Sequence, residues 1–239
     1  MSNELKFDKF DLVLANRILA QHGVLDGFGH VSMRNPDHSE HYFLSRSLAP
    51  ELVTQDDIIE FNLDSEPLHG DTRRLYLERY IHGEIYKQRP DVQAIVHSHS
   101  PSVIPFAASS VRLRPIYHMA GFLTGGAPIF DIRKMFGNTD LLVTCCDHGA
   151  ELSRILGDAN ISLMRGHGFV AVGSSLAVAV YRAIYTELNA SLQEKAINLG
   201  GEIIYLEDEE GEKADASICG VMHRPWELWK QKVEERLDQ

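Results

Sequence analysis

Three histidines in this sequence have the spacing and surroundings of metal ligands. His97 and His99 follow the apolar run 92–96, and alternate residues of a strand point to one face, so both imidazoles should lie together. His167 stands between two glycines, which allow a close backbone approach and an unusual turn. Three neutral imidazoles suit Zn²⁺ and tolerate Mn²⁺, Fe²⁺ or Co²⁺. Chance is the alternative, because the chain has twelve histidines.

Glu78 could place a carboxylate beside these rings, but its neighbours offer a simpler explanation. Arg74 lies four residues before it and His82 four residues after it, a spacing that brings side chains together on a helix. From the residues alone, Glu78 is a helix-face ion-pair partner rather than a catalytic candidate.

Composition limits the fold and the partners. The 239 residues are 44% hydrophobic and 24% charged, which predicts one α/β domain over residues 1–239, without a repeat or a linker. The net charge of −11 opposes binding to nucleic acid or to a membrane surface. An anionic small-molecule substrate would need a local reversal of charge, from a metal or from a few arginines.

The cysteines and the N-terminal segment predict a cytoplasmic protein. Three cysteines are too few for a disulfide framework, and two of them are adjacent. The first twenty residues contain no apolar run of signal-peptide or membrane-spanning length.

Hydrophobic periodicity predicts the elements that must position the histidines. Helices are expected over residues 8–21 with Asp8 as a possible cap, 74–86, 100–108, 149–156 and 176–199. Strands are expected over 27–32, 41–44, 58–63, 92–96, 114–119, 141–145, 161–164 and 169–172, and a solvated acidic loop over 207–212. Because no strict βαβ rhythm is present, this order predicts a layered α/β domain with a mostly antiparallel or mixed sheet.

Three motifs, in order and at the right intervals, resemble the class II aldolase/adducin family. They are GFGHVS (27–32), ERYIHGEIYKQRPDVQAIVHSHS (78–100) and MRGHGFVAVG (164–173), and with the intervening spacing they cover about residues 10–199. The resemblance implies a three-layer α/β/α fold and a homotetramer around a four-fold axis, with active sites where neighbouring subunits meet. It also implies a divalent metal, Zn or Mn, held by His97, His99 and His167, with Glu78 as the catalytic acid/base.

Departures from the family pattern bear on the substrate. The sugar-phosphate enzymes hold phosphate with an Asn, a Thr-Gly pair and two serines, and these positions look like His30, residues 47–48 and residues 76–77 here. Leu and Tyr at such positions remove hydrogen-bond donors and room for backbone amides, so a phosphorylated sugar is not expected.

The side chains left near that pocket could bind a carboxylate, because guanidinium groups match carboxylate geometry. They are His30, Arg46, Ser47, Arg73 and Arg74. Alternatively, the adjacent arginines merely decorate a helix N-terminal turn, where cations are mildly unfavourable.

The catalytic tyrosine of the sugar-phosphate aldolases is replaced here by His118, with Tyr117 beside it. The segments GHVS, SRSLAPE and GDTRRLYLER resemble most the decarboxylases of hydroxylated aromatic or pyridine dicarboxylates. The leading hypothesis is therefore metal-dependent decarboxylation of an ortho-hydroxy aromatic carboxylate, with Glu78 or His118 as the proton carrier. Retro-aldol cleavage of a hydroxy-keto acid or a sugar-derived substrate is the alternative. An adducin-like interaction module without catalysis is a hypothesis of another class, and it predicts lost ligands.

Overall fold

One seven-stranded sheet organises the protein, whose computed structural model describes residues 9–237. The strand order is β3-β2-β1-β4-β7-β6-β5, with β5 and β6 parallel and every other neighbouring pair antiparallel. The strands are β1 (His30–Arg34), β2 (His41–Ser45), β3 (Ile58–Asn62), β4 (Ala94–Ser98), β5 (Ile129–Phe130), β6 (Ile161–Met164) and β7 (Gly168–Gly173). The expected α/β fold with a mostly antiparallel, mixed sheet is confirmed.

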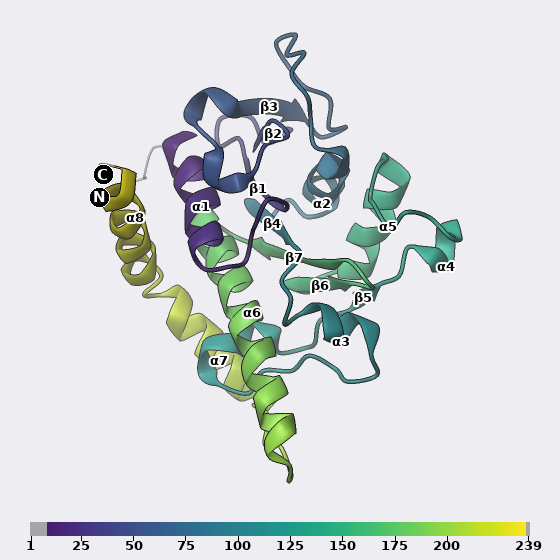
Figure 1. The fold of residues 1–239 in the computed structure, drawn as a ribbon, viewed down its shortest axis with the longest axis vertical. Coiled ribbons are helices and arrows are strands. Elements are labelled where there is room, and N and C mark those ends of the chain that lie inside the picture. The colour runs from purple at the N-terminus through teal and green to yellow at the C-terminus, as the bar shows by residue number, and fades with distance from the viewer. Residues whose placement is uncertain (1–8, 238–239) are drawn as a thin grey trace.

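Helices cover both faces of this sheet (Figure 1). They are α1 (Lys9–Gln21), α2 (Tyr80–Gln88), α3 (Ile104–Ala108), α4 (Arg133–Phe136), α5 (Cys146–Leu156), α6 (Leu176–Leu199), α7 (Asp208–Cys219) and α8 (His223–Leu237). The described part of the chain also contains four 3₁₀ turns: Pro50–Leu52, Gln55–Asp57, Leu77–Arg79 and His118–Leu123. Over the described residues, no helix is both long and apolar enough to span a bilayer.

Alternation along the central strands creates two separate cores. Val96 of β4 and Phe169 of β7 pack with α1 and α6, whereas Ile95 and Val170 pack with α2 and α5 on the opposite face. Because successive strand residues point to opposite faces and both faces are covered, β7 and the first three residues of β4 are apolar throughout. The result is a helix layer, a sheet and a second helix layer.

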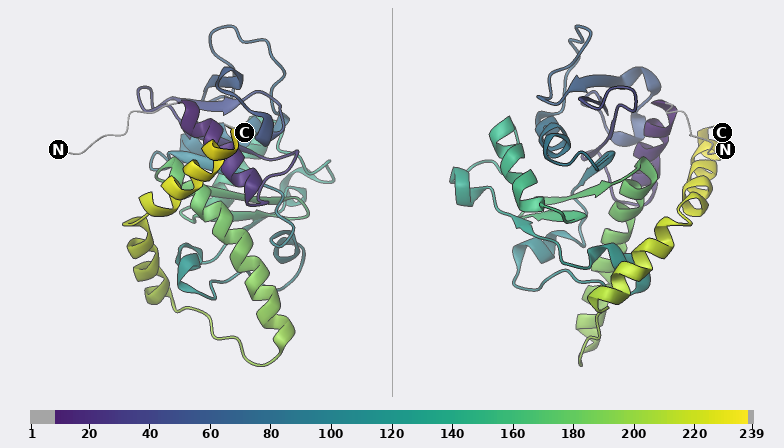
Figure 2. Two further views of the ribbon diagram at one scale, coloured as in Figure 1. Left: turned by 60° about the vertical axis from the view of Figure 1, so that its left-hand side comes forward. Right: turned by 180° about the vertical axis from the view of Figure 1, so that it is seen from behind.

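The two C-terminal helices run along the outer side of α1 and α6 (Figures 1 and 2). Trp229 of α8 is buried in the α1/α6 core, and Lys230 forms an ion pair with Asp11 at 2.6 Å. The acidic loop expected over residues 207–212 is wrong, because these residues begin α7. Glu207 and Glu210 form a reciprocal capping box there, and acidic groups are favourable at a helix N-terminus.

Two expected strands are absent from the described chain because side chains satisfy their backbone groups. Residues 114–119 pair with amide side chains of α6: Asn189 bonds to the N–H of Ile116 and to the carbonyl of Arg114, and Gln193 bonds to the N–H of Arg114. Residues 141–145 instead direct backbone groups toward a cluster of polar side chains, and Leu141 has a positive φ of 72°.

Several boundaries differ from expectation. The helix expected from residue 74 begins at Tyr80, after the 3₁₀ turn, and the strand expected from residue 27 begins at His30. The helix expected over 100–108 is shortened to Ile104–Ala108, while α6 has the predicted limits. Asp8, the possible cap of α1, lies outside the described residues. The short β5 and α4 were not predicted.

Candidate active site

Three imidazoles meet where β4 ends and β7 begins. His97 belongs to β4 and His99 follows it with the same parity, so both point to the α2/α5 face; His167 lies in the turn that leads into β7. The Nε2 atom of His99 is 3.1 Å from Nε2 of His97 and 3.0 Å from Nε2 of His167. Three ring nitrogens, two from the end of β4 and one from a turn 68 residues later, therefore converge on one point.

Backbone carbonyls fix the orientation of two rings. Nδ1 of His97 lies 3.1 Å from the carbonyl oxygen of Phe169, and Nδ1 of His167 lies 3.0 Å from that of Leu141. A carbonyl can only accept, so each Nδ1 carries the proton, and in the neutral ring Nε2 is left with its lone pair. Such bonds orient metal-binding histidines. The ligand atoms of the cluster lie within 4.8 Å of one another, so a cation between them could accept these lone pairs.

Glu78 completes the cluster from the 3₁₀ turn Leu77–Arg79. Its Oε2 atom is 3.5 Å from Nε2 of His97 and 3.4 Å from Nε2 of His167, and the four side chains form a group with metal-ligand spacing. Because the turn has φ −92° and ψ 18° at Glu78, the side chain leaves the helix register. Its ionic partners are therefore these histidines and not its expected helix neighbours.

Burial and charge shape the acid–base behaviour of the cluster. Desolvation would raise the pKa of Glu78, but the charge of His97 and hydrogen bonds from His167 and His97 hold it well below the usual range. Desolvation lowers the pKa of His99 to about 4, with repulsion from the other two rings adding to it. For His167 desolvation is outweighed by Glu78, so its pKa is raised. Glu78 is thus the anionic member of the site.

Glycine at 168 is required for the close approach of the two strands. A Cβ atom at this position would lie 2.0 Å from the carbonyl oxygen of Ser98 and 3.2 Å from Cα of His99. The preceding glycine, Gly166, has a positive φ of 66°, a backbone conformation that L-residues rarely adopt. The expected role of the two glycines around His167 is confirmed.

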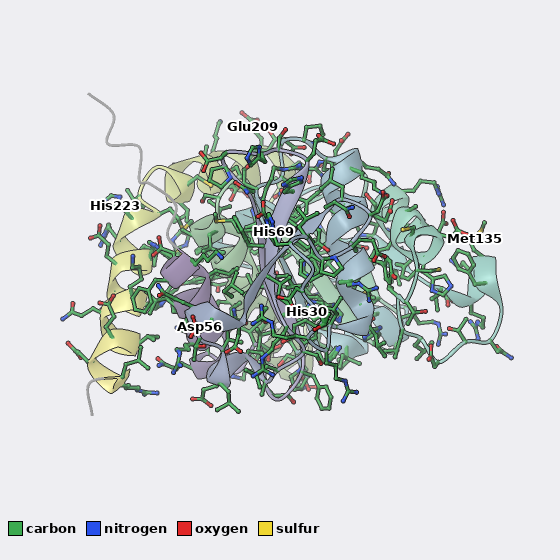
Figure 3. The ribbon with its side chains drawn as sticks, turned by 90° about the horizontal axis from the view of Figure 1, so that it is seen from above. His30, Asp56, His69, Met135, Glu209 and His223 are labelled. Atoms are coloured by element: carbon green, nitrogen blue, oxygen red, sulfur yellow. The ribbon has the colours of Figure 1, made fainter. Side chains whose placement is uncertain are left out.

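A cavity of about 500 Å³ opens beside the cluster. Glu78 and His99 lie in its wall, which also contains three of the expected substrate-binding residues, His30, Ser47 and Arg74. Over the described residues the Arg74 guanidinium has no ion-pair partner, so its charge is available to a ligand. His30, labelled in Figure 3, is buried, with its ring 4.7 Å from that of Tyr76 and 5.0 Å from that of His97.

The two other expected arginines are engaged elsewhere. Arg46 forms an ion pair with Asp57 at 2.6 Å, and Arg73 binds the carboxylate of Asp71 and the carbonyl of Asp56, which is labelled in Figure 3. Neither belongs to the cavity wall. Of the two adjacent arginines that were both expected to bind the substrate, only Arg74 therefore lines the cavity.

His118, the second expected catalytic residue, lies outside the wall of this cavity. It begins the 3₁₀ turn His118–Leu123, which packs against α6 and α7, and its side chain is exposed. Its ring neighbour is Tyr117, with centroids 6.3 Å apart. Within one chain, His118 is not brought together with Glu78.

Sequence reasoning missed two residues of this region. Phe28 is 70% exposed at the cavity, and its ring centroid lies 6.4 Å from that of His99. The position of Phe28, a large apolar residue between two glycines, could have indicated a role at the cavity. His82 is fully buried and bonds to His30, although the sequence suggested only a helix-face neighbour of Glu78.

Comparisons with known proteins agree with this geometry. Residues 10–194 match the class II aldolase and adducin N-terminal domain. The decarboxylase tropJ of Talaromyces stipitatus is 38% identical over 240 residues, covering 91% of this chain and 90% of that protein. The 3,4-dihydroxyphthalate decarboxylase of Arthrobacter keyseri is 30% identical over 237 residues, covering 93% and 91%.

A solved structure shares the fold. The L-fuculose 1-phosphate aldolase from Glaciozyma antarctica PI12 superposes with a TM-score of 0.78 at 24% identity, over 95% of this chain and 88% of that one. The resemblance seen in the three sequence motifs is thereby confirmed. The chain belongs to the class II aldolase/adducin family, and it is an enzyme of the lyase type.

Proposed function

We propose that this enzyme is a divalent-metal-dependent decarboxylase of a hydroxylated aromatic or pyridine carboxylate or dicarboxylate. The observation that carries the proposal is the convergence of His97, His99, His167 and Glu78 beside a cavity whose wall contains an arginine with no ion-pair partner within residues 9–237. The two decarboxylase relatives, each similar over at least 90% of both chains, support it.

The three histidines would hold the metal, either Zn²⁺ or Mn²⁺. Two neutral rings with protonated Nδ1 atoms and lone pairs directed inward fit a cation, as does the carboxylate of Glu78 beside them. When bound, the ion supplies Lewis-acid stabilisation of negative charge on substrate oxygens.

Cavity residues would orient the substrate. The Arg74 guanidinium can form two parallel hydrogen bonds with a carboxylate, and the Ser47 hydroxyl can donate a further one. The tyrosine and leucine side chains around them would cover the faces of an aromatic ring. This arrangement would select which carboxylate leaves by fixing the ring relative to Glu78.

Glu78 would carry the proton. Its Oε1 accepts a hydrogen bond from the backbone N–H of Val143, so Oε2, the oxygen that faces Nε2 of His97 and His167, would accept the proton of the substrate hydroxyl group. That proton then passes to the ring carbon, and the carbon–carbon bond breaks with its electrons remaining in the ring as CO₂ leaves. The oxygen from which the proton came regains one from water, so one proton is consumed for each CO₂ released.

The assembly and location are part of the same proposal. Because His118 is exposed and lies outside its own chain's cavity, it would serve the site of an adjoining subunit in a homotetramer. Light scattering should then give about four times the chain mass of 26.9 kDa. Three free cysteines suit a reducing, cytoplasmic environment.

Product analysis tests the reaction. Enzyme reconstituted with Zn²⁺ or Mn²⁺ is incubated with hydroxylated aromatic dicarboxylates and, separately, with hydroxy-keto acids, while CO₂ and aldehyde are measured. CO₂ from the aromatic set supports the proposal, and aldehyde release alone would replace it with a retro-aldol activity. Failure to bind metal after reconstitution would favour a non-catalytic adducin-like module.

A further inference from the structure

A chain of four buried polar side chains leads away from the candidate active site. The Tyr86 hydroxyl lies 2.8 Å from Oγ of Ser32, and that Oγ lies 2.6 Å from Nδ1 of His82. Nε2 of His82 lies 2.6 Å from Nδ1 of His30, whose ring forms part of the cavity wall. No step of the proposed reaction uses Tyr86, Ser32 or His82.

This hydrogen-bonded chain consists of two pairs of residues with matching spacing, one pair on β1 and one on α2. His30 and Ser32 alternate on β1 and share the face that α2 covers, while His82 and Tyr86 are four residues apart on α2. Two residues of a strand rise by about 6.6 Å and four residues of a helix by about 6 Å, so the two pairs lie in step. All four residues are at most 3% exposed, and Ser32, His82 and Tyr86 do not line the cavity.

The number of protons available shows which atom donates in each hydrogen bond of this series. Among the described residues, Ser32 is the hydrogen-bond partner of the Tyr86 hydroxyl. If Ser32 donated to Tyr86, the tyrosine proton would be buried without an acceptor, which is costly. Tyr86 therefore donates to Ser32, and Ser32 donates to Nδ1 of His82. With both rings neutral, Nε2–H of His82 then donates to Nδ1 of His30.

We propose that this chain fixes His30 as the Nε2–H tautomer, so that His30 is a hydrogen-bond donor to an anionic oxygen of the ligand. His82 and Ser32 are positioning residues that act through His30. Nε2 is the ring atom of His30 left for the cavity, because Nδ1 is occupied. If the hydrogen bonds ran the other way, Nε2 of His30 would carry a lone pair toward the cavity, and that lone pair would repel an anion. The part that concerns the substrate rests on the proposed decarboxylase function, whereas the tautomer does not.

Nitrogen NMR tests the tautomer directly. In zinc-loaded enzyme labelled with ¹⁵N-histidine, the His30 signals are assigned by difference from His30→Gln. We expect a protonated Nε2 and an unprotonated Nδ1 for both His30 and His82. A protonated Nδ1 on His30, or averaging between the two tautomers, overturns the proposal, whether or not the enzyme decarboxylates anything.

Ser32→Ala tests the coupling. Without the serine hydroxyl nothing fixes the direction, so the His30 signals should show a mixture of tautomers. The Kd of phthalate, an unreactive aromatic dicarboxylate, should rise about threefold to tenfold by calorimetry. Ser162→Ala is the matched control, since Ser162 is an equally buried strand serine that bonds to the carbonyl of Pro128.

The control should leave both the tautomer and phthalate binding unchanged. Equal weakening of phthalate binding in both variants, with an unaltered His30 tautomer in Ser32→Ala, would reduce the chain to a packing role and contradict the proposal. An unchanged Kd in Ser32→Ala together with mixed tautomers would overturn its ligand-binding part.

Discussion

Oε1 of Glu78 accepts a hydrogen bond from the backbone N–H of Val143 at 3.0 Å. This bond joins a 3₁₀ turn to a loop 65 residues later, and the same loop presents the carbonyl of Leu141 to His167. One irregular segment therefore orients two members of the candidate metal site. Its backbone groups bond to side chains of the site and not to a neighbouring strand.

Glu78→Gln should separate structure from chemistry. The amide oxygen can still accept from Val143, so we expect Tm to change by only a few degrees. The proton-carrying charge is lost, and kcat should fall about 10²–10⁴-fold, the usual contribution of a general acid–base group. Rates of CO₂ release and thermal melts measure the two effects.

Glu84→Gln provides the control for that substitution. Glu84 is similarly buried on the neighbouring helix, but its carboxylate pairs with Lys87 at 2.6 Å. Its kcat should stay within about twofold of the native value. Equal activity losses in the two variants would remove Glu78 from the chemistry.

The sequence predicted local geometry well and long-range convergence poorly. The alternation that puts His97 and His99 on one face is a property of a single strand, and it is confirmed. Spacing alone could not bring Glu78 to these rings, because that depends on packing between α2 and the sheet. The family resemblance supplied this step.

The strands wrongly expected at 114–119 and 141–145 show that local sequence also fails to predict secondary structure where the hydrogen-bond partners are distant. Both segments are apolar enough for a strand, but Asn189, Gln193 and Glu78 satisfy backbone groups that a neighbouring strand would otherwise satisfy. Such partners are distant in the sequence. Likewise, only the positions of Asp71 and Asp56 show that Arg73 turns away from the cavity.

Arg74→Ala and Arg73→Ala should differ although the residues are adjacent. Arg74 belongs to the cavity wall, so its loss removes a charge-assisted bond to the substrate carboxylate and should raise KM about tenfold or more. Arg73 is bound to Asp71, and KM should change less than twofold without it. Steady-state kinetics compare them, and equal KM values for both variants would refute this assignment.

His99→Ala should weaken metal binding more than it weakens the fold. His99 is the least buried of the three rings, and the other two keep their carbonyl partners. The apparent metal Kd should rise at least as much as the ~10–100-fold caused by losing an outer-shell partner. Competition with a fluorescent chelator measures it. His69→Ala, at an exposed histidine, should bind metal normally, and unchanged affinity in His99→Ala would exclude this ring as a ligand.

The metal-free protein should lose stability as the pH falls from about 6.5 to 4. Desolvation and repulsion from His97 lower the pKa of His82 to about 3, so the unfolded chain binds protons in this window and the folded chain does not. His82 alone should reduce the free energy of unfolding by on the order of 3 kcal/mol by pH 4. His30 acts in the same direction, whereas His167, whose pKa is raised, opposes it. Denaturant melts across this range measure the slope, and a flat profile would contradict it.

Gly168→Ala should damage the site through the backbone. The added Cβ would lie 2.0 Å from the carbonyl oxygen of Ser98, so β7 must move away from β4 at the point where His99 and His167 face each other. We expect a loss of about 1–3 kcal/mol in the free energy of unfolding and a weaker metal affinity than in the native enzyme. Gly220→Ala is the control, because its Cβ would meet nothing closer than 3.4 Å. Native metal affinity in a destabilised Gly168→Ala protein would show that the strand spacing sets stability without setting the ligand geometry.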